Sequence, residues 1–322
     1  MKLILLILSI FVFGFNSYSQ QRGTYSNFLL NDVYYNPAIA GSKNIHIANI
    51  SYRNQWVGFD GAPTLLMGNF YGSVKNKGKM GYGVSLLSEK VGITQSTTFS
   101  INYAHHFKLS EKMKLGLGIQ PGYMQYRVKL YDAVLADQGD DVLTGSVYSA
   151  NALDASAGFN LYSDKFFIMG SVHHLLGKEI RFTSYNSNLD FHFNGIAGYN
   201  ILFKKKNFEL QPSVMFKYTQ PVPYQITGML KGTFNNKFWI GVLYKTDDAA
   251  GVSVGVNLKD RLTVGYGFDY VLSKLSNYQS GSHEIVLSFN LTKEKPTLEE
   301  EDDKLNNSIL DEMKDNMEKD KK

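Results

Sequence analysis

The sequence predicts an all-β protein: an antiparallel transmembrane β-barrel of about 14 strands, with a periplasmic N-terminal segment and a charged C-terminal tail. Apolar and polar residues alternate along segments of similar length, and the connections between these segments alternate between short and long. The composition includes 21 Tyr, 21 Phe and 29 Gly but only 7 Pro. Mean hydropathy is −0.21 although 43% of the residues are hydrophobic, so apolar residues are interleaved with polar ones, as in a membrane barrel.

The first 19 residues have the pattern of a cleaved signal peptide. Lys2 precedes an apolar run from Leu3 to Phe15, and small residues end the segment at Ser19. The run is too short for a membrane-spanning helix, which needs about 20 residues. The chain has no Cys, which excludes disulfides, thiolate metal sites and a lipid-attachment cysteine. We therefore expect an exported, non-lipidated protein whose mature chain begins at Gln20.

Residues 20–43 form a separate segment between the signal peptide and the first strand. It contains the stretch "YYNPAIAGS", in which Pro37 disfavours a helical conformation at Asn36. The small residues Ala38, Ala40 and Gly41 permit close packing. We expect this segment at the periplasmic mouth of the barrel, as a structured plug that reaches into the lumen rather than as a free loop.

Residues 44–292 carry the strand signal. In "TTFSINYAHHF", Ile101 and Tyr103 fall on one face and Ser100 and Asn102 on the other, because successive side chains of a strand point to opposite sides. Most such segments are near the roughly 9–11 residues that cross a bilayer. The expected strands are 44–54, 62–74, 80–88, 94–107, 113–127, 152–162, 166–175, 189–203, 208–218, 224–234, 237–245, 251–258, 261–273 and 282–292.

The connections between these strands predict the orientation. Every second one is short: "KNKGK", "KLSEK", "SDK", "KKKN", "NN" and "KD". The longest of the others are "QWVGFDGA", "SEKVGI", residues 128–151 and "GKEIRFTSYNSNL". Short periplasmic turns and long outer loops are typical of outer-membrane barrels, so both termini are expected in the periplasm. The aromatic residues expected at the two membrane interfaces are Trp56, Tyr71, Tyr103, Tyr126, Trp239, Tyr244 and Tyr270.

The tail, residues 293–322, has no strand signal and carries 7 basic and 11 acidic residues. Leu305, Ile309, Met313 and Met317 recur at four-residue intervals, which is one narrow helical stripe. Two interpretations stay open: a solvated disordered tail, or a short amphipathic helix in the periplasm that folds on a partner.

Residue patterns that would support catalysis or metal binding are weak. The pairs 105–106 and 173–174 are both His-His, but adjacent residues of a strand face opposite sides and cannot hold one ion together. Asp137, Asp140 and Asp141 could bind Ca²⁺ weakly, but their spacing lacks the full EF-hand pattern, so a solvated loop is the preferred interpretation. Lys residues lie mainly in turns rather than in one patch, which argues against nucleic acid. We expect no cofactor, no metal and no enzymatic activity.

Two N-terminal motifs and the last strand carry a family resemblance. "NPAIAGS" at 36–42, "YRNQWVGFDGAP" at 52–63 and "GSHEIVLSFNL" at 281–291 resemble the PorP/SprF family. These are outer-membrane proteins of the type IX secretion and gliding machinery of Bacteroidota. The residues that match the family motifs are Asn36, Pro37, Gly41, Arg53, Trp56 and Gly58.

This resemblance implies an integral, non-enzymatic barrel that supports secretion or cell-surface attachment of an adhesin through the adhesin's C-terminal sorting domain. It also implies contact with the periplasmic ring of the machinery or with an OmpA-like peptidoglycan-binding protein. We expect the long outer loops 128–151 and 176–188 to hold the partner. The loop aromatics expected as anchors are Tyr131, Tyr148, Phe182 and Tyr185.

A second function class is a porin-like or FadL-like outer-membrane channel. The Gly, Ser and Asn residues of the polar strand face would then line a lumen that side chains need not fill. An open, conducting lumen favours the channel, and a plugged lumen favours the attachment function.

Overall fold

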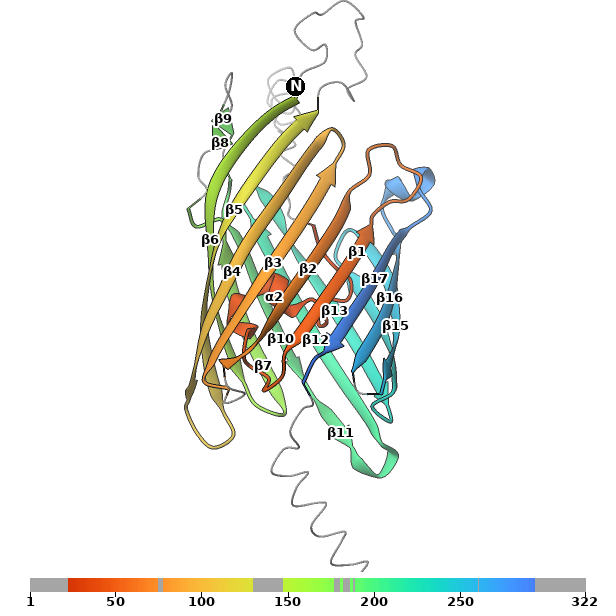
Figure 1. Cartoon of the computed structure of the whole chain (residues 1–322). Coiled ribbons are helices and arrows are strands. Elements are labelled where there is room, and N and C mark those ends of the chain that lie inside the picture. The colour runs from red at the N-terminus through yellow and green to blue at the C-terminus, as the bar shows by residue number, and fades with distance from the viewer. Residues whose placement is uncertain are drawn as a thin grey trace, which may run out of the picture.

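A single closed antiparallel barrel makes up most of the molecule, as predicted (Figure 1). The computed structural model describes residues 23–74, 78–129, 147–176, 180–181, 186–187, 189–259 and 261–292. The barrel strands are β1 Ile47–Asn54, β2 Thr64–Ser73, β3 Met80–Val91, β4 Thr94–Lys108, β5 Lys114–Lys129, β6 Val147–Tyr162, β7 Phe166–His173, β10 His192–Tyr199, β11 Ile201–Phe203, β12 Phe208–Thr219, β13 Val222–Phe234, β14 Phe238–Lys245, β15 Ala249–Leu258, β16 Leu262–Val271 and β17 Ser282–Asn290.

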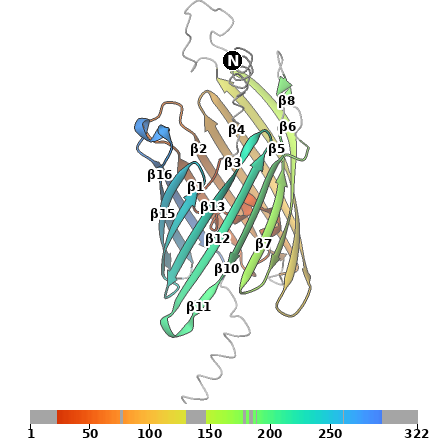
Figure 2. The same cartoon turned by 180° about the vertical axis from the view of Figure 1, so that it is seen from behind.

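The ring closes between its first and last strands, a pairing that the order of neighbouring strands does not specify. Strand β1 pairs with β17 along its whole length, from Ile47 opposite Asn290 to Asn54 opposite His283. Strand β10 pairs with both β7 and β12, which is visible from behind in Figure 2. Because β10 and β11 are one path interrupted at Asn200 and both pair with β12, the barrel has fourteen strands around its wall. This confirms the predicted fold class.

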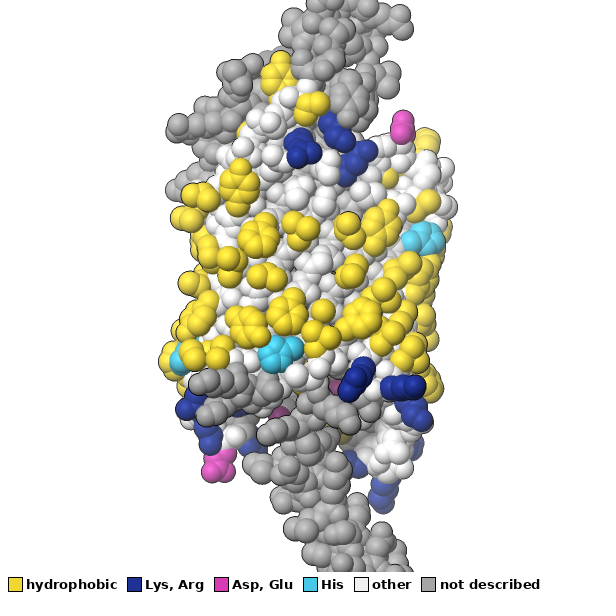
Figure 3. Space-filling view, in the orientation of Figure 1, with side chains coloured by type: hydrophobic (Ala, Val, Ile, Leu, Met, Phe, Trp, Pro, Cys, Tyr) yellow, Lys and Arg dark blue, Asp and Glu magenta, His cyan; other side chains and the backbone are white. Residues whose placement is uncertain are grey.

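The outer wall is apolar and the inner wall is largely polar. On β4, Ile101 is 52% exposed and its neighbour Asn102 only 1%, which matches the predicted alternation. Hydrophobic side chains form a broad band across the visible face of the barrel, with Lys and Arg above and below it (Figure 3). A closed sheet that presents apolar residues outward and leaves no free strand edge is the arrangement that lipid permits.

Only some of the aromatic residues that were predicted at the membrane interfaces face outward. Tyr103, Tyr244 and Tyr270 face outward, as expected, with exposed fractions of 47%, 54% and 57%. Tyr71 and Trp239 are instead buried, and both point into the barrel with the odd-numbered residues of their strands. The sequence pattern alone did not separate these two from outward-facing aromatics, because both strand faces carry large residues near their ends.

Short connections lie mainly at one end of the barrel and long connections at the other, but less strictly than predicted. We call the end with residues 109–113, 163–165, 204–207, 235–237 and 259–261 the turn end, and the opposite end the loop end. The stretch "SEKVGI" was expected as a long loop, but β3 continues to Val91 and β4 begins at Thr94. Only Gly92 and Ile93 separate them, and Gly92 has φ +56°, a conformation that favours glycine in a tight turn.

Short elements lie outside the barrel wall. Strands β8 Ile180–Arg181 and β9 Asn186–Ser187 form a two-stranded ribbon between β7 and β10. The helix η5 Lys204–Lys206 lies at the turn end and η6 Lys274–Tyr278 at the loop end. In the described part of the chain, no helix is both long enough and apolar enough to span a membrane.

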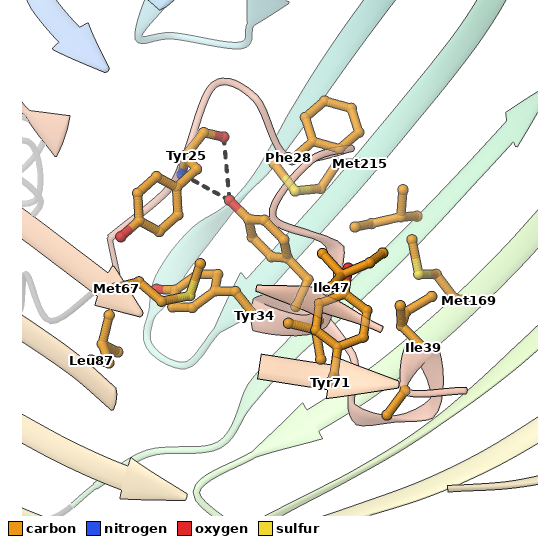
Figure 4. Close-up of a cluster of buried hydrophobic side chains, with 14 of the residues drawn as sticks. Tyr25, Phe28, Tyr34, Ile39, Ile47, Met67, Tyr71, Leu87, Met169 and Met215 are labelled. Carbon is orange, nitrogen blue, oxygen red and sulfur yellow. Dashed lines mark hydrogen bonds between the residues drawn. The ribbon is translucent and has the colours of Figure 1, made fainter. Parts of the chain in front are cut away.

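Residues 23–45, which we call the plug, lie inside the barrel (Figure 1). The plug contains helix α2 Asp32–Tyr35 and the single turn η1 Pro37–Ile39. Its side chains pack against Met67, Met169 and Met215 of the wall in one buried cluster (Figure 4). The hydrophobic core of this protein is therefore the contact between plug and wall.

Candidate functional site

The turn end of the plug meets the wall at glycines. Gly41, with φ +79°, lies against Gly81 of β3, and an added Cβ on Gly81 would stand 1.8 Å from the Ala40 carbonyl oxygen. A Cβ on Gly118 of β5 would stand 2.4 Å from the backbone nitrogen of Ala38. Backbone therefore packs directly on backbone here, an approach that only glycine permits.

Asn36 anchors the middle of the plug to β6 and β7. Its Nδ2 donates to the carbonyl oxygens of Phe159 at 2.7 Å and Gly170 at 3.2 Å. Its Oδ1 accepts from the backbone nitrogen of Ala38 at 2.9 Å, which caps the η1 turn begun by Pro37. One side chain thus holds the local turn and joins it to the wall.

Two inward-facing histidines bind plug carbonyls. The distance from His106 Nε2 to the Ala40 oxygen is 2.8 Å, and that from His173 Nε2 to the Tyr35 oxygen is 2.9 Å. Both rings are buried. Carbonyl groups that an irregular segment leaves unpaired inside a barrel need such partners.

The helix α2 lies against β2 inside the lumen. Tyr71 donates its hydroxyl to Asp32 Oδ1 at 3.0 Å. Burial raises the pKa of the Asp32 carboxyl above its usual range, while Lys43 and the Tyr71 hydrogen bond act in the opposite direction. The contact therefore ties the plug to the wall through a buried carboxyl.

A cluster of four buried charges holds the loop end of the plug. Arg53 Nη2 lies 2.6 Å from Asp269 Oδ2, and Lys245 Nζ lies 2.8 Å from the same oxygen. Arg53 Nη1 lies 3.4 Å from Glu284 Oε2. All four side chains are at most 2% exposed. We call Arg53, Lys245, Asp269 and Glu284 the charge cluster; its formal charges cancel, as buried ions require.

The plug completes the charge cluster with hydrogen bonds. The backbone nitrogens of Ser26 and Asn27 donate to Glu284 at 2.6 and 2.9 Å. Ser26 Oγ donates to Asp269 Oδ2 at 2.6 Å and accepts from Arg53 Nη1 at 2.7 Å. The charges from β1, β14, β16 and β17 are therefore fully arranged only when the plug is seated.

A cavity of about 800 Å³ lies above the plug at the loop end, and we call it the vestibule. Its lining comes from β1 to β6, β10, β13 and β14 and from the loops beside them, and it includes Arg53, Met67 and Leu87. Ser96, Thr98 and other small polar residues line it beside apolar side chains. Its volume falls within the range typical of ligand pockets.

The loop 55–63 borders the vestibule. Trp56 has φ +51° and Gly58 φ +95°. The backbone nitrogen of Val57 donates to the Gly281 oxygen at 2.8 Å, so this loop is pinned to the residues before β17. The six predicted family-motif residues thus fall into three places: Asn36, Pro37 and Gly41 in the plug, Arg53 in the charge cluster, and Trp56 and Gly58 in this loop.

The predicted partner residues are only partly placed. Strand β6 begins at Val147, so Tyr148 belongs to a strand end rather than to a free loop, and it packs against Val128 and Ala150. Tyr131, Phe182 and Tyr185 lie outside the described residues, as do the predicted signal peptide 1–19 and the predicted tail 293–322. These assignments stay predictions.

The histidine pairs follow the expected geometry in one case only. His106 faces the lumen while His105 contacts Phe107 on the other face. His173 and His174 are both buried, because β7 ends at His173 and His174 turns at φ +64° to bind Asp154 at 2.8 Å. In the part of the chain that the structure describes, no three His, Cys, Asp or Glu side chains are arranged to hold a metal ion.

Sequence reasoning missed the charge cluster. Its members are far apart in the chain, and only closure of the ring between β1 and β17 brings Arg53 to Glu284. A usable signal was present: Asp269 and Glu284 are acidic residues within segments that cross lipid, at positions of the polar face. Charges in such places face an interior partner.

Several solved structures are similar to this chain at low sequence identity. A Pseudomonas aeruginosa FadL homologue is similar at a TM-score of 0.46 and 11% identity, covering 80% of this chain and 93% of its own. The CymD monoaromatic hydrocarbon channel has a TM-score of 0.47 and 10% identity, and the match covers 84% of this chain and 95% of the channel. The Acinetobacter baumannii protein Omp33 has a TM-score of 0.43 and 10% identity, and the match covers 78% of this chain and 100% of Omp33. These values are too low to transfer any activity.

A comparison with curated proteins gave no match. The family described as type IX secretion system membrane protein PorP/SprF matches residues 17–289, which include the plug, the charge cluster and every barrel strand up to β17. The chain therefore belongs to the PorP/SprF family, and it is an integral outer-membrane β-barrel of the type IX secretion system.

Proposed function

We propose that this barrel is a plugged, non-enzymatic component that supports secretion or surface attachment of an adhesin-type substrate by the type IX machinery. The observation that carries the proposal is the plug. A channel needs a continuous open lumen, whereas here the backbone of residues 38–41 packs on wall glycines with no space for a Cβ. The family match supplies the secretion context.

The loop end is the surface on which we expect the adhesin's C-terminal sorting domain. In outer-membrane barrels the longer loops face outward, and residues 130–146 and 177–188 belong to the longest connections of this end. Tyr131, Tyr148, Phe182 and Tyr185 are the proposed aromatic anchors in or beside these connections, since aromatic residues dominate interface hot spots.

The turn end is where we expect contact with the periplasmic ring or with an OmpA-like peptidoglycan-binding protein. Strand β17 ends there, so the charged tail 293–322 starts on that side. Deleting 293–322 and testing which periplasmic partners copurify distinguishes a docking tail from a merely solvated one. Unchanged copurification would remove the docking function.

The decisive experiment replaces residues 130–146 and 177–188 with short turns. We expect the barrel to assemble, with surface retention of its adhesin lost. A variant shortened at the turn end, within 109–113, is the matched control and keeps retention. Normal retention with both outer loops replaced would refute the proposal.

The vestibule keeps a channel function as the second candidate, because its volume is that of a ligand pocket. Conductance of the purified protein in planar bilayers separates the two. A plugged barrel gives no large, steady current, whereas a substrate channel with a displaced plug does.

A further inference from the structure

We infer that the vestibule is a binding site for the chain's own mature amino-terminal residues, Gln20 to Arg22, with Arg22 as its cation. The amino terminus of the mature protein then lies at the loop end of the barrel, opposite the end at which β17 terminates. The inference depends on signal cleavage after Ser19 and is independent of the proposed adhesin function.

The direction of the plug is the first observation. Gly41 lies beside Gly81, at the turn end of β3. Ser26 lies in the charge cluster, beside Arg53 and Lys245 at the loop ends of β1 and β14. Gly23, the first described residue, donates its backbone nitrogen to Glu89 Oε1 at 2.8 Å, near the loop end of β3. The plug therefore runs from the loop end towards the turn end.

The length of the preceding chain is the second observation. Cleavage after Ser19 leaves only residues 20–22 before Gly23. Three residues span about 10 Å at full extension. The plug and the wall occupy the path back to the turn end, where residues 38–41 pack directly against strand backbone. The new amino terminus consequently stays at the loop end, at the vestibule that Gly23 and Thr24 line.

The charge of the vestibule is the third observation. Its lining includes Glu89, Asp247 and Asp248. No ion pair of these three carboxylates occurs within the described ranges. The lining cations Arg53 and Lys245 are already paired with Asp269 and Glu284. Arg22 directly precedes Gly23, whose backbone nitrogen donates to Glu89, so we assign Arg22 as the cation that faces these carboxylates.

Unused hydrogen-bond donors are the fourth observation. Trp56 and Arg53 both line the vestibule. Trp56 Nε1 and Arg53 Nε are buried and have no hydrogen-bond partner among the described residues. A buried donor without a partner costs about 1–3 kcal/mol. Backbone carbonyl oxygens, which residues 20–22 would bring into the vestibule, are acceptors suited to such donors.

Single cysteines test the position, because the chain contains no Cys. Gln21→Cys is compared with Asp60→Cys in the exposed loop 55–63 at the loop end, and with Lys237→Cys in the exposed turn 235–237 at the turn end. Intact and outer-membrane-permeabilised cells are treated with a small, charged maleimide that does not cross membranes. We expect Gln21→Cys to be labelled in intact cells together with Asp60→Cys, while Lys237→Cys requires permeabilisation.

Labelling of Gln21→Cys that follows the pattern of Lys237→Cys instead of that of Asp60→Cys would overturn the inference. Mass spectrometry of the purified protein must also find a chain that begins at Gln20; a retained leader would overturn it equally. Because the two control positions define the two ends within the same cells, the result does not depend on an assumed orientation. Adhesin retention is not part of the readout, so failure here and failure of the proposed function are distinguishable.

The charge is tested in the Gln21→Cys background. Arg22→Glu places like charges beside Glu89, so we expect residue 21 to leave the wall and to react several-fold faster. Arg22→Lys keeps the cation and is expected to react at the parental rate. Equal rates for Arg22→Glu and Arg22→Lys would refute the assignment of Arg22 as the bound cation.

Discussion

Gly81→Ala should unseat the plug although it adds a single methyl group. The new Cβ would stand 1.8 Å from the Ala40 oxygen, 2.1 Å from its carbonyl carbon and 2.6 Å from the Gly41 nitrogen. Real Cβ atoms essentially never approach other heavy atoms within 3.0 Å. All three neighbours are backbone atoms, so no side-chain rotation relieves the clash, and the plug itself must move.

Overpacking of this kind costs about 1–3 kcal/mol. If the unseated plug relieves the clash, the ratio of unseated to seated molecules rises roughly 5- to 150-fold. Planar-bilayer recordings measure this ratio as the fraction of time in a conducting state. We expect rare openings in the wild-type protein and frequent ones in Gly81→Ala.

Gly68→Ala is the matched control. Gly68 lies on the neighbouring strand β2, and an added Cβ there has no heavy atom within 4 Å. The chemical change and the strand context are the same, but the plug is not touched. Equal open fractions for the two variants would refute the reasoning that the Gly41–Gly81 contact closes the lumen.

Three further predictions concern stability, measured as the unfolding midpoint in denaturant with the protein in lipid vesicles. Arg53→Met should lower the free energy of unfolding by about 3–5 kcal/mol, because it leaves Asp269 and Glu284 with one buried cation. A decrease below about 1 kcal/mol would contradict the stabilising role of the charge cluster. Asn36→Ala should lower the free energy of unfolding by about 1–3 kcal/mol, since two strand carbonyl oxygens lose the hydrogen bond from the Asn36 side chain. An unchanged midpoint would show that other contacts hold the plug. Ile101→Arg should lower the free energy of unfolding by about 2–4 kcal/mol, because it places a charge on the lipid-facing side of β4 at the middle of the strand. Normal stability would contradict the lipid-facing position of residue 101.

Part of the functional site could be predicted from sequence. The motif Asn36-Pro37 with Gly41 marked a segment packed closely against something, because small residues and a fixed turn serve close approach. The partners of that segment could not be predicted. Which wall glycines meet Ala38 and Gly41 depends on how far each strand is shifted along the ring, and residue spacing within one strand carries no information about that shift.

The outward faces show where local pattern suffices and where it fails. Ile101 and Tyr103 were placed correctly, because alternation along β4 is a property of the strand itself. Tyr71 and Trp239 were placed on the wrong face, since an aromatic residue suits both the lipid interface and a buried plug contact. The presence of apolar plug residues in the lumen follows from the tertiary structure and not from the pattern of a single strand.

The sequence by itself determined the fourteen-stranded barrel, the positions of its strands and the presence of a packed segment before β1. These follow from period-two alternation and turn chemistry, which act over a few residues. Only the tertiary structure decided that the plug runs from the loop end to the turn end and that Arg53, Lys245, Asp269 and Glu284 meet around Ser26. Ring closure between β1 and β17 joins residues more than 200 positions apart, and no local pattern encodes that contact.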